Sequence, residues 1–343
     1  MALSGGRPPY TGDIAVSSSA SPYVLVYAWT STGFGTKYTD PATLPTTPIS
    51  IGKSVVFHPQ KHTIIIGSTT SPYISAYPWT TGTGFGTKFA DPSTAPVALT
   101  TGRGVAFDPL GAYVFVLGQG AYPYSYYAWS QSTGFGSTRY LSPYTVTDDT
   151  YELTWNPTGT VIGWPSSTGT GGSYYSWSGS ATTGAIDTGL VAGKTLAWSA
   201  DNAYVALGYS SSPYVNVYPW NDSTGQGTAV SNPATLPPGE VNSLSFNNYT
   251  RDLACAHNSS PYISVYSFSG GFGTKYSDPS TLPTGTGNGI RWSPDGTLLA
   301  IAHATSPYIS VYPWTQGLGF GAKYSNPGTL PTGTCYAVDF LPL

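Results

Sequence analysis

Residues 306–314 read Ser-Pro-Tyr-Ile-Ser-Val-Tyr-Pro-Trp, and versions of this nine-residue phrase recur along the whole chain. Clear copies begin at Ser21, Ser71, Ser212 and Ser260, and weaker ones run through residues 122–124 and 173–175. A strand-rich repeat of roughly 40 to 50 residues, punctuated by glycine, is typical of radially arranged β-sheets. The 343 residues therefore predict one repetitive body rather than two unrelated domains.

The last complete repeat predicts four antiparallel strands. Its second strand is almost continuously apolar, as expected of a strand buried on both faces, whereas its third alternates apolar and polar residues. A Pro-Asp-Gly turn separates the first two strands, and a Gly-Phe-Gly segment predicts the turn before the outer strand. In order, the predicted segments are 289–294, 298–303, 308–314, the turn at 319–321, the outer strand from 322 and a proline-rich crossing at 326–331.

The two ends of the sequence predict how the repeats close. The chain starts with a strand of the second type at 14–17 and finishes with an isolated strand of the first type at 337–340. Pairing these strands completes a seventh sheet and removes the open edges of the ring. An open solenoid would instead need distinct capping repeats, and neither end resembles one.

We therefore predict an all-β fold: a single seven-bladed β-propeller of four-stranded antiparallel blades. The ring is closed by the C-terminal strand, which pairs into the N-terminal blade. The fourth unit is short and lacks the usual outer-strand wording, which indicates either drift or a docking face where a partner replaces the missing strand. The predicted blades are 10–46 plus 335–343, 52–97, 102–147, 150–190, 193–238, 240–284 and 287–332, within one domain spanning 1–343.

The segment Ser293-Pro294-Asp295-Gly296, followed by Leu298-Leu299-Ala300, resembles the repeats of WD40-like β-propellers. The Trp-Asp pair typical of that family is replaced by Pro-Trp or Ala-Trp, so its buried Asp-His network is not expected. The combination of Ser-Pro-Tyr-Ile-Ser-Val-Tyr with Gly-Phe-Gly-Thr-Lys is similar to WD40-like proteins encoded by tailed bacteriophages. This second resemblance implies a virion or extracellular location.

Composition excludes several functions. Charged residues are only 8% of the chain, against about 25% in ordinary domains, and the net charge is -3 without a basic stripe. Nucleic acid is therefore not an expected partner, and no stretch is long and apolar enough for membrane insertion. Cys255 and Cys335 lack the spacing of a disulfide or metal knuckle, so no metal or cofactor is predicted.

The repeated tyrosines are the candidate ligand-binding residues. They follow the proline of each phrase and are predicted to ring one face of the disc, where amphipathic aromatics offer contact area to a ligand. The alternative is that each tyrosine packs against the neighbouring blade and fixes its own loop. The candidates are Tyr23, Tyr73, Tyr124, Tyr214, Tyr262 and Tyr308.

His257 and His303 occupy one repeat position on neighbouring blades, four residues before the proline, and are weaker ligand-binding candidates. Two imidazoles alone do not make a zinc site, which takes three or four ligands. The alternative for both is a structural histidine inside the blade.

No catalytic residues are predicted. Carboxylates are sparse, and Asp148, Asp149 and Glu152 form the one dense cluster. Neither a nucleophile elbow nor a phosphate-binding loop occurs in the sequence. The expected function is therefore a non-catalytic structural or interaction protein of a phage virion, as a tail, fibre or capsid-decoration component. Its expected partners are other virion proteins and a host cell-surface glycan; a carbohydrate-binding adhesin is the alternative, ahead of a glycan-active enzyme.

Overall fold

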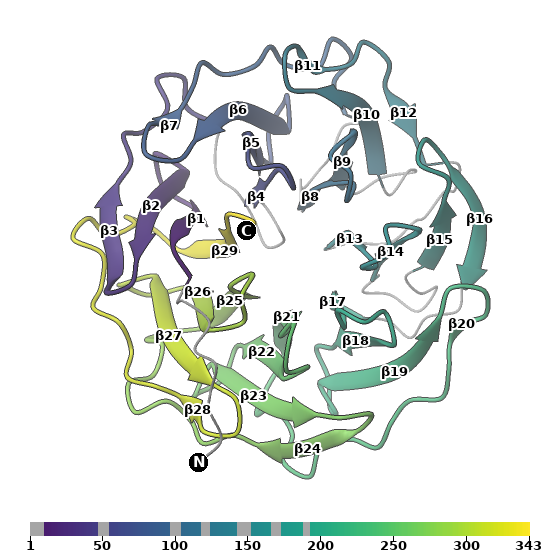
Figure 1. Cartoon of the computed structure of the whole chain (residues 1–343), viewed down its shortest axis with the longest axis vertical. Helices are drawn as coiled ribbons and strands as arrows, with labels where there is room; N and C mark the ends of the chain where they lie inside the picture. Colours follow the sequence, from purple (N-terminus) through teal and green to yellow (C-terminus); the bar gives the residue numbers. More distant parts are fainter. Residues whose placement is uncertain are drawn as a thin grey trace.

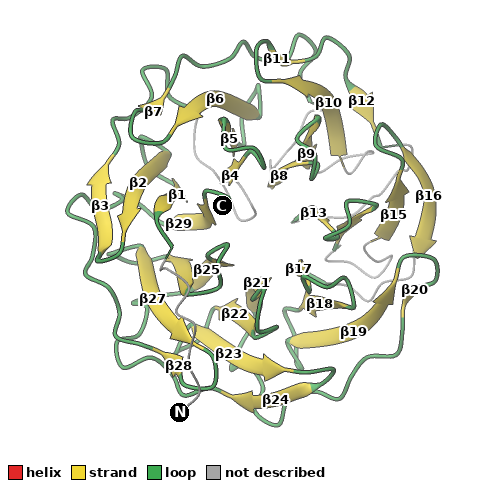
Figure 2. Cartoon of the chain, viewed as in Figure 1, coloured by secondary structure: helices red, strands yellow, loops and turns green. Residues whose placement is uncertain are grey.

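Seven antiparallel blades surround a common centre in the computed structural model of this chain (Figure 1); each has four strands in order outward, and in the third blade β12 (Tyr140–Leu141) also pairs with β10 (Tyr124–Ser130). The structure describes residues 10–46, 55–96, 104–117, 124–142, 152–165, 173–187 and 193–343. Its described elements are strands joined by loops and turns (Figure 2). The predicted fold class is therefore confirmed, whereas the blade boundaries given above stay predictions. No helix among the described residues is long and apolar enough to cross a membrane.

In blades 2 to 7 the strands run outward from the centre in chain order, whereas in blade 1 the C-terminal strand lies innermost, followed by the first three strands of the chain. The innermost strands are β29 (Cys335–Phe340), β4 (Val55–Phe57), β8 (Gly104–Phe107), β13 (Thr154–Trp155), β17 (Thr195–Trp198), β21 (Val241–Phe246) and β25 (Gly287–Trp292). The second strands are β1 (Gly12–Ser18), β5 (Thr63–Gly67), β9 (Tyr113–Leu117), β14 (Val161–Trp164), β18 (Tyr204–Gly208), β22 (Leu253–His257) and β26 (Leu298–His303).

The outer half of each blade carries the repeated phrase. The third strands are β2 (Val24–Thr30), β6 (Ile74–Thr80), β10 (Tyr124–Ser130), β15 (Ser173–Trp177), β19 (Val215–Asn221), β23 (Ile263–Phe268) and β27 (Ile309–Thr315). The outermost strands are β3 (Gly33–Lys37), β7 (Gly84–Phe85), β11 (Gly134–Phe135), β12 (Tyr140–Leu141), β16 (Thr182–Asp187), β20 (Gly225–Gln226), β24 (Phe272–Lys275) and β28 (Gly319–Phe320). Blades are numbered 1 to 7 in the order of these second strands, so that blade 1 contains β29, β1, β2 and β3.

Ring closure occurs as predicted. β29 pairs antiparallel with β1, with Ile14 opposite Phe340 and Val16 opposite Val338. The Tyr10 hydroxyl also donates to the Leu341 carbonyl oxygen at 2.8 Å, which ties the two ends of the described chain together. The first blade is thus built from both ends of the sequence.

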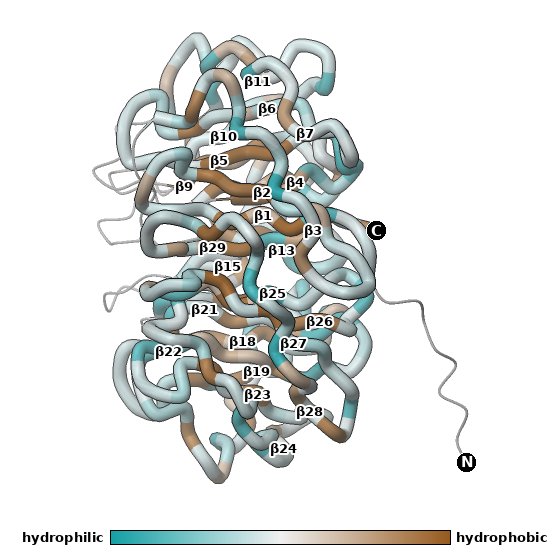
Figure 3. Tube along the Cα trace, turned by 90° about the vertical axis from the view of Figure 1, so that its left-hand side faces the viewer, coloured by the Kyte–Doolittle hydropathy of each residue, from teal (hydrophilic) through white to brown (hydrophobic). Residues whose placement is uncertain are grey.

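The hydrophobic cores lie between blades. Successive residues of a second strand point to opposite faces, so Ile14 and Val16 pack toward blade 7 while Ala15 packs toward blade 2. Figure 3 shows these apolar strands inside the disc and more polar loops around them. Because each core is shared by two neighbours, the ring is held together by the same apolar surface that stabilises each sheet.

At two of these contacts between neighbouring blades, which we call seams, a buried carboxylate adds hydrogen bonds across the contact. Asp13 accepts hydrogen bonds from Trp79 Nε1 and Thr81 Oγ1 of blade 2, both at 2.9 Å, and from the Tyr38 hydroxyl of its own blade at 2.8 Å. Asp252 does the same between blades 6 and 7, accepting from Trp314 Nε1 at 3.0 Å and from the Tyr276 hydroxyl at 3.2 Å. We call each set a carboxylate clamp.

The Gly-Phe-Gly segments are not turns, which corrects the sequence prediction. Trp314 pairs with Phe320 and Thr315 with Gly319, so the segment itself begins the outer strand. Gly319 has a φ of +91°, and a Cβ there would lie 3.2 Å from the ring of Tyr276 in the preceding blade. Glycine is therefore required both by the backbone conformation and by the close approach of the neighbouring blade.

The outer strand of blade 4 is longer than the sequence predicted. Its outer strand was expected to be reduced, but β16 spans six residues and pairs along β15 with two register shifts. A Thr-rich strand without a Gly-Phe-Gly opening carries no strong sequence signal, which explains the error. Residues 168–172, a run of threonine and glycine for which the sequence predicts a flexible connector, lie outside the described residues.

Candidate functional site

Five of the six predicted tyrosines lie directly after the loop between the second and third strands. Tyr23, Tyr73, Tyr214, Tyr262 and Tyr308 all have φ between 65° and 69°, and the Ser-Pro bond before each is cis. All five are half-buried, and Tyr23, Tyr73, Tyr214 and Tyr308 pack against the cores between blades. This packing agrees with the structural alternative, and ligand binding at these residues stays a prediction.

Tyr124 differs from the other five. It lies in β10, its side chain is buried, and its hydroxyl lies 3.1 Å from Thr182 Oγ1 of blade 4. The expected place of Tyr124 in a surface ring is therefore wrong. The proline that precedes it in sequence lies outside the described residues.

His257 and His303 lie at the ends of β22 and β26 and are fully buried. His257 Nδ1 lies 2.7 Å from the Ser259 carbonyl oxygen, and its Nε2 lies 3.1 Å from Ser264 Oγ. Burial lowers the pKa of each imidazole to about 4. In blade 2 the same position is held by Ser68, whose hydroxyl donates to the Thr70 carbonyl oxygen. The side chain at this position therefore stabilises the loop that follows the second strand.

The innermost strands border the centre of the ring, which we call the channel, and one repeat position on them is the residue just before the aromatic that ends each strand. Alternation of side chains along these strands turns this residue to the face of its sheet opposite the aromatic, where Val56, Ala106 and Ala197 pack against the core shared with the next blade. Five positions carry small, hydroxyl or aliphatic side chains, and two neighbouring positions are charged. We call this set the channel ring: Val56, Ala106, Thr154, Ala197, Ser245, Arg291 and Asp339.

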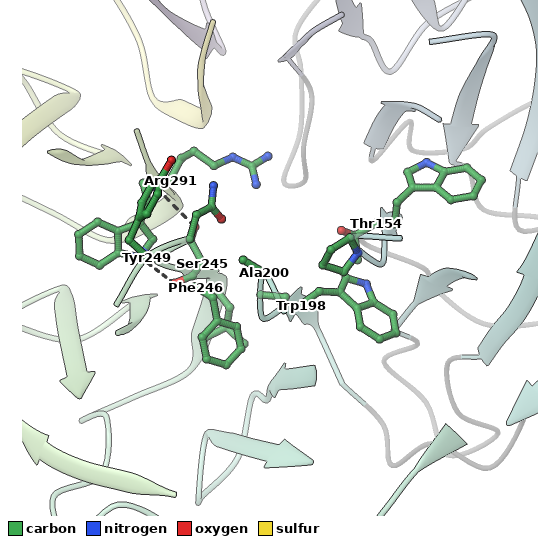
Figure 4. A pocket seen from close by; sticks show the side chains of 13 residues that line it. Thr154, Trp198, Ala200, Ser245, Phe246, Tyr249 and Arg291 are labelled. Carbon is green, nitrogen blue, oxygen red and sulfur yellow. Dashed lines mark hydrogen bonds between the residues drawn. The ribbon is translucent and has the colours of Figure 1, made fainter. Parts of the chain in front are cut away.

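A cavity of about 510 Å³ opens beside the channel ring of blades 4 to 7. Four ring residues line it together with turn residues between the first and second strands, which places it at the end of the disc opposite the repeated tyrosines. Figure 4 shows Arg291 on one side of the hollow and Thr154 and Trp198 across from it. The remaining lining residues are Trp155, Pro157, Ala197, Ala200, Leu244, Ser245, Phe246, Asn248, Tyr249 and Trp292.

Arg291 and Asp339 form the polar centre of this region. Arg291 Nε lies 3.3 Å from Asp339 Oδ1, and both side chains are largely but not completely buried, with 28% and 13% exposed. Asp339 Oδ2 accepts the backbone N–H of Phe57 at 3.0 Å, so it contacts both blade 7 and blade 2. The guanidinium end of Arg291 extends toward the hollow in Figure 4.

The wall beneath Arg291 is held by neighbouring strands. Trp292 donates from its backbone N–H to Ser245 Oγ at 3.4 Å and from Nε1 to the Ser245 carbonyl at 3.0 Å. These bonds tie β25 to β21, and they fix the direction in which Arg291 leaves its strand. The site therefore has a rigid base and a charged side chain that projects from it.

The sequence did not identify Arg291 and Asp339 as site residues. Comparing the channel-ring position across the seven repeats would have found them, because charge occurs there in two repeats only. Of the predicted carboxylate cluster, Asp148 and Asp149 lie outside the described residues. Glu152 is buried, and it accepts hydrogen bonds from Thr195 Oγ1 at 2.5 Å and the Leu196 backbone N–H at 3.2 Å. No group of three His, Cys, Asp or Glu side chains suited to a metal ion occurs in the described ranges.

Solved structures share this fold. No protein-family model and no curated protein matches the chain. A Bacteroides fragilis protein assigned as a 6-phosphogluconolactonase is 10% identical with a TM-score of 0.71, covering 98% of this chain and 99% of its own. A periplasmic gluconolactonase from Pseudomonas aeruginosa is 13% identical with a TM-score of 0.70, covering 97% and 99%. A Bacteroides uniformis protein with the same assignment as the first is 15% identical with a TM-score of 0.68, covering 96% and 99%.

These comparisons contradict the functional prediction. A non-catalytic virion protein was expected, but structures that match almost the whole chain carry the names of lactonases. The same names contradict the prediction that the protein is not an enzyme. At this level of identity the likeness establishes the propeller fold, and neither a WD40-like family nor a phage origin is shown.

Proposed function

We propose that this protein is a hydrolase of sugar lactones. It would act in the 510 Å³ cavity beside the channel ring of blades 4 to 7, which we call the channel cavity. The observation that carries the proposal is the contact between Arg291 and Asp339, the two charged members of the channel ring, beside a cavity of about 510 Å³. Small-molecule sites usually measure about 300–1,000 Å³ and combine apolar walls with a few placed polar groups. The lactonase names of structures with this fold add support.

The two residues suit the two requirements of lactone hydrolysis. Attack by water on the lactone carbonyl carbon creates an oxyanion, which the guanidinium N–H groups of Arg291 would stabilise. Asp339 would accept the proton of the attacking water as general base. When the tetrahedral intermediate collapses, the ring C–O bond breaks and the leaving oxygen takes that proton, giving an open-chain hydroxy acid.

The geometry around Asp339 fits the role of base. The Phe57 N–H donates to Oδ2 and the Arg291 guanidinium lies beside Oδ1, so the carboxylate is held in place next to the guanidinium. Trp155 and Trp198 supply apolar surface on which the C–H face of a sugar ring would pack. Thr154 and Asn248 offer polar groups for sugar hydroxyls along the same cavity.

The test is hydrolysis of glucono-δ-lactone and 6-phosphogluconolactone, followed by acid release in a weakly buffered indicator assay. We expect a rate above spontaneous hydrolysis for at least one lactone, and a loss of about 10²–10³-fold in Asp339→Asn and Arg291→Gln. Arg251→Gln is the matched control, because Arg251 pairs with Asp201 outside this cavity. Absence of catalysis with both lactones, or equal rates for all variants, would overturn the proposal.

A further inference from the structure

We infer that the channel cavity selects an uncharged sugar lactone over its phosphorylated counterpart. This inference rests on the proposed function and names the substrate class of the same site. The structures that share the fold carry names of both kinds, so the fold itself does not decide between them.

The charge of the cavity favours a neutral ligand. Arg291 is the one cationic side chain among its described lining residues, and Asp339 already faces it across 3.3 Å. The other lining side chains are aromatic, aliphatic, amide or hydroxyl groups. The local charge of the site is therefore close to zero before any ligand enters.

Arg251, a cation close in sequence to a lining residue of the cavity, is directed elsewhere. Arg251 follows Tyr249 by two residues, but its guanidinium pairs with Asp201 and lies 6.0 Å from the centre of the Tyr204 ring. It therefore points to the seam between blades 5 and 6. Nothing among the described lining residues replaces it as a second cation for the cavity.

A phosphate monoester carries about -1.5 to -2 charges at neutral pH and needs several charge-assisted hydrogen bonds to replace its hydration. One guanidinium that is already paired cannot supply them, so burying the dianion would leave it poorly compensated. A neutral sugar needs only hydroxyl partners and an apolar surface for its ring, which Thr154, Asn248 and the two tryptophans provide.

The inference is tested by binding and by turnover. Calorimetric titration with 1,5-gluconolactam, a non-hydrolysable analogue, and with its 6-phosphate compares the two ligand classes directly, and kcat/KM for the two lactones compares them in catalysis. We expect at least a tenfold preference for the neutral member of each pair. Equal or tighter binding of the phosphorylated analogue overturns the inference. If the neutral analogue binds but neither lactone is hydrolysed, the proposed function fails and the inference about ligand charge stands.

Charge variants sharpen the test. Asp339→Asn removes the partner of Arg291 and should shift the binding preference toward the phosphorylated analogue by about tenfold. Thr154→Lys, which adds a second cation to the channel ring, should shift it in the same direction. Leu110→Lys adds the same charge at an exposed turn outside the cavity and should leave the preference unchanged. If Thr154→Lys and Leu110→Lys behave alike, the charge of the cavity does not set specificity.

Discussion

Asp13 is a buried carboxylate whose hydrogen bonds reach two blades. Removing it in Asp13→Ala leaves the Trp79, Thr81 and Tyr38 donors without their acceptor, at roughly 1–3 kcal/mol for each donor that stays buried. We expect a loss of stability on the order of 3 kcal/mol or more, measured by urea unfolding.

The control for Asp13→Ala is Asp40→Ala, which removes a surface carboxylate paired with Lys37. An exposed pair of this kind contributes about 0–1 kcal/mol. Similar unfolding midpoints for the two variants would show that the clamp does not stabilise the seam.

The buried histidines predict a pH dependence of stability. The pKa of His257 and of His303 is about 4 in the folded protein, because burial disfavours the charged imidazole, against about 6.5 when unfolded. Between these values the unfolded chain binds protons that the folded chain does not. Stability therefore falls as the pH drops from about 6.5 to 4, by up to about 3 kcal/mol per histidine.

We expect the melting temperature of His257→Ser/His303→Ser to change less between pH 7 and pH 4.5 than that of the unaltered protein. Serine is the natural choice because Ser68 holds the same position and fastens its loop in blade 2. An unchanged pH profile in the double variant would contradict this account.

At the residue scale, the sequence repeats made recurring residues easy to predict and made exceptional residues easy to miss. Tyr308 and His303 were recognised because their positions recur, and their places at the ends of loops and strands were predicted correctly. Arg291 and Asp339 were missed because they are exceptions within their own repeat position. A residue that performs chemistry once per ring differs from its counterparts, so repeat consensus hides it.

At the scale of the blade element, the seam between blades 2 and 3 lacks the carboxylate clamp. Thr63 stands where Asp13 stands in blade 1, and its hydroxyl donates to Gln131 Oε1 at 2.9 Å. Trp129 Nε1 is buried in the described structure without a hydrogen-bond partner. Phe89 replaces the clamp tyrosine, so the whole arrangement is absent here.

Grafting the clamp should stabilise this seam. In Thr63→Asp/Phe89→Tyr the carboxylate would accept from Trp129 Nε1 and from the new hydroxyl, and a hydrogen bond to a charged group contributes about 1.5–3 kcal/mol before desolvation is subtracted. We expect a rise of a few degrees in melting temperature, measured by calorimetry. Thr63→Asn/Phe89→Tyr, which lacks the charge, should give a smaller rise; a larger rise would refute the charge-assisted mechanism.

The inner strands of the blades were easier to predict than the outer ones. β26 runs over Leu298–His303, the range expected from its unbroken apolar residues. The two-residue strands such as β28 have no periodicity to read, and their opening glycine suggests a turn. Their position depends on pairing with Trp314 and on the approach of Tyr276 from the neighbouring blade, neither of which is local in sequence.

At the scale of the whole molecule, β29 closes the ring. Val338, Phe340 and Leu341 are buried at the closure, and each large apolar side chain contributes about 1.5–3 kcal/mol. The sum is comparable with the total stability of an ordinary domain, about 5–15 kcal/mol. A chain ending at residue 334 should therefore lose its cooperative melting transition.

Calorimetry and size-exclusion chromatography of the truncated chain check this expectation, and a peptide of residues 335–343 added in trans should restore part of the transition. A truncated chain that melts like the complete one would show that the ring is stable while open. The matched control is a peptide in which Val338 and Phe340 are replaced by serine, which should not restore the transition.

The contacts of Asp339 connect occupancy of the channel with the mechanical integrity of the disc. Its carboxylate reaches Arg291 in blade 7 and the Phe57 backbone in blade 2, while its own strand completes blade 1. A small molecule that binds Arg291 and Asp339 would therefore stabilise the contacts among three consecutive blades, 7, 1 and 2. By mass action a ligand at 100 times its Kd adds about 2.7 kcal/mol to the closed state, so a thermal-shift screen would report on channel ligands before any assay of turnover exists.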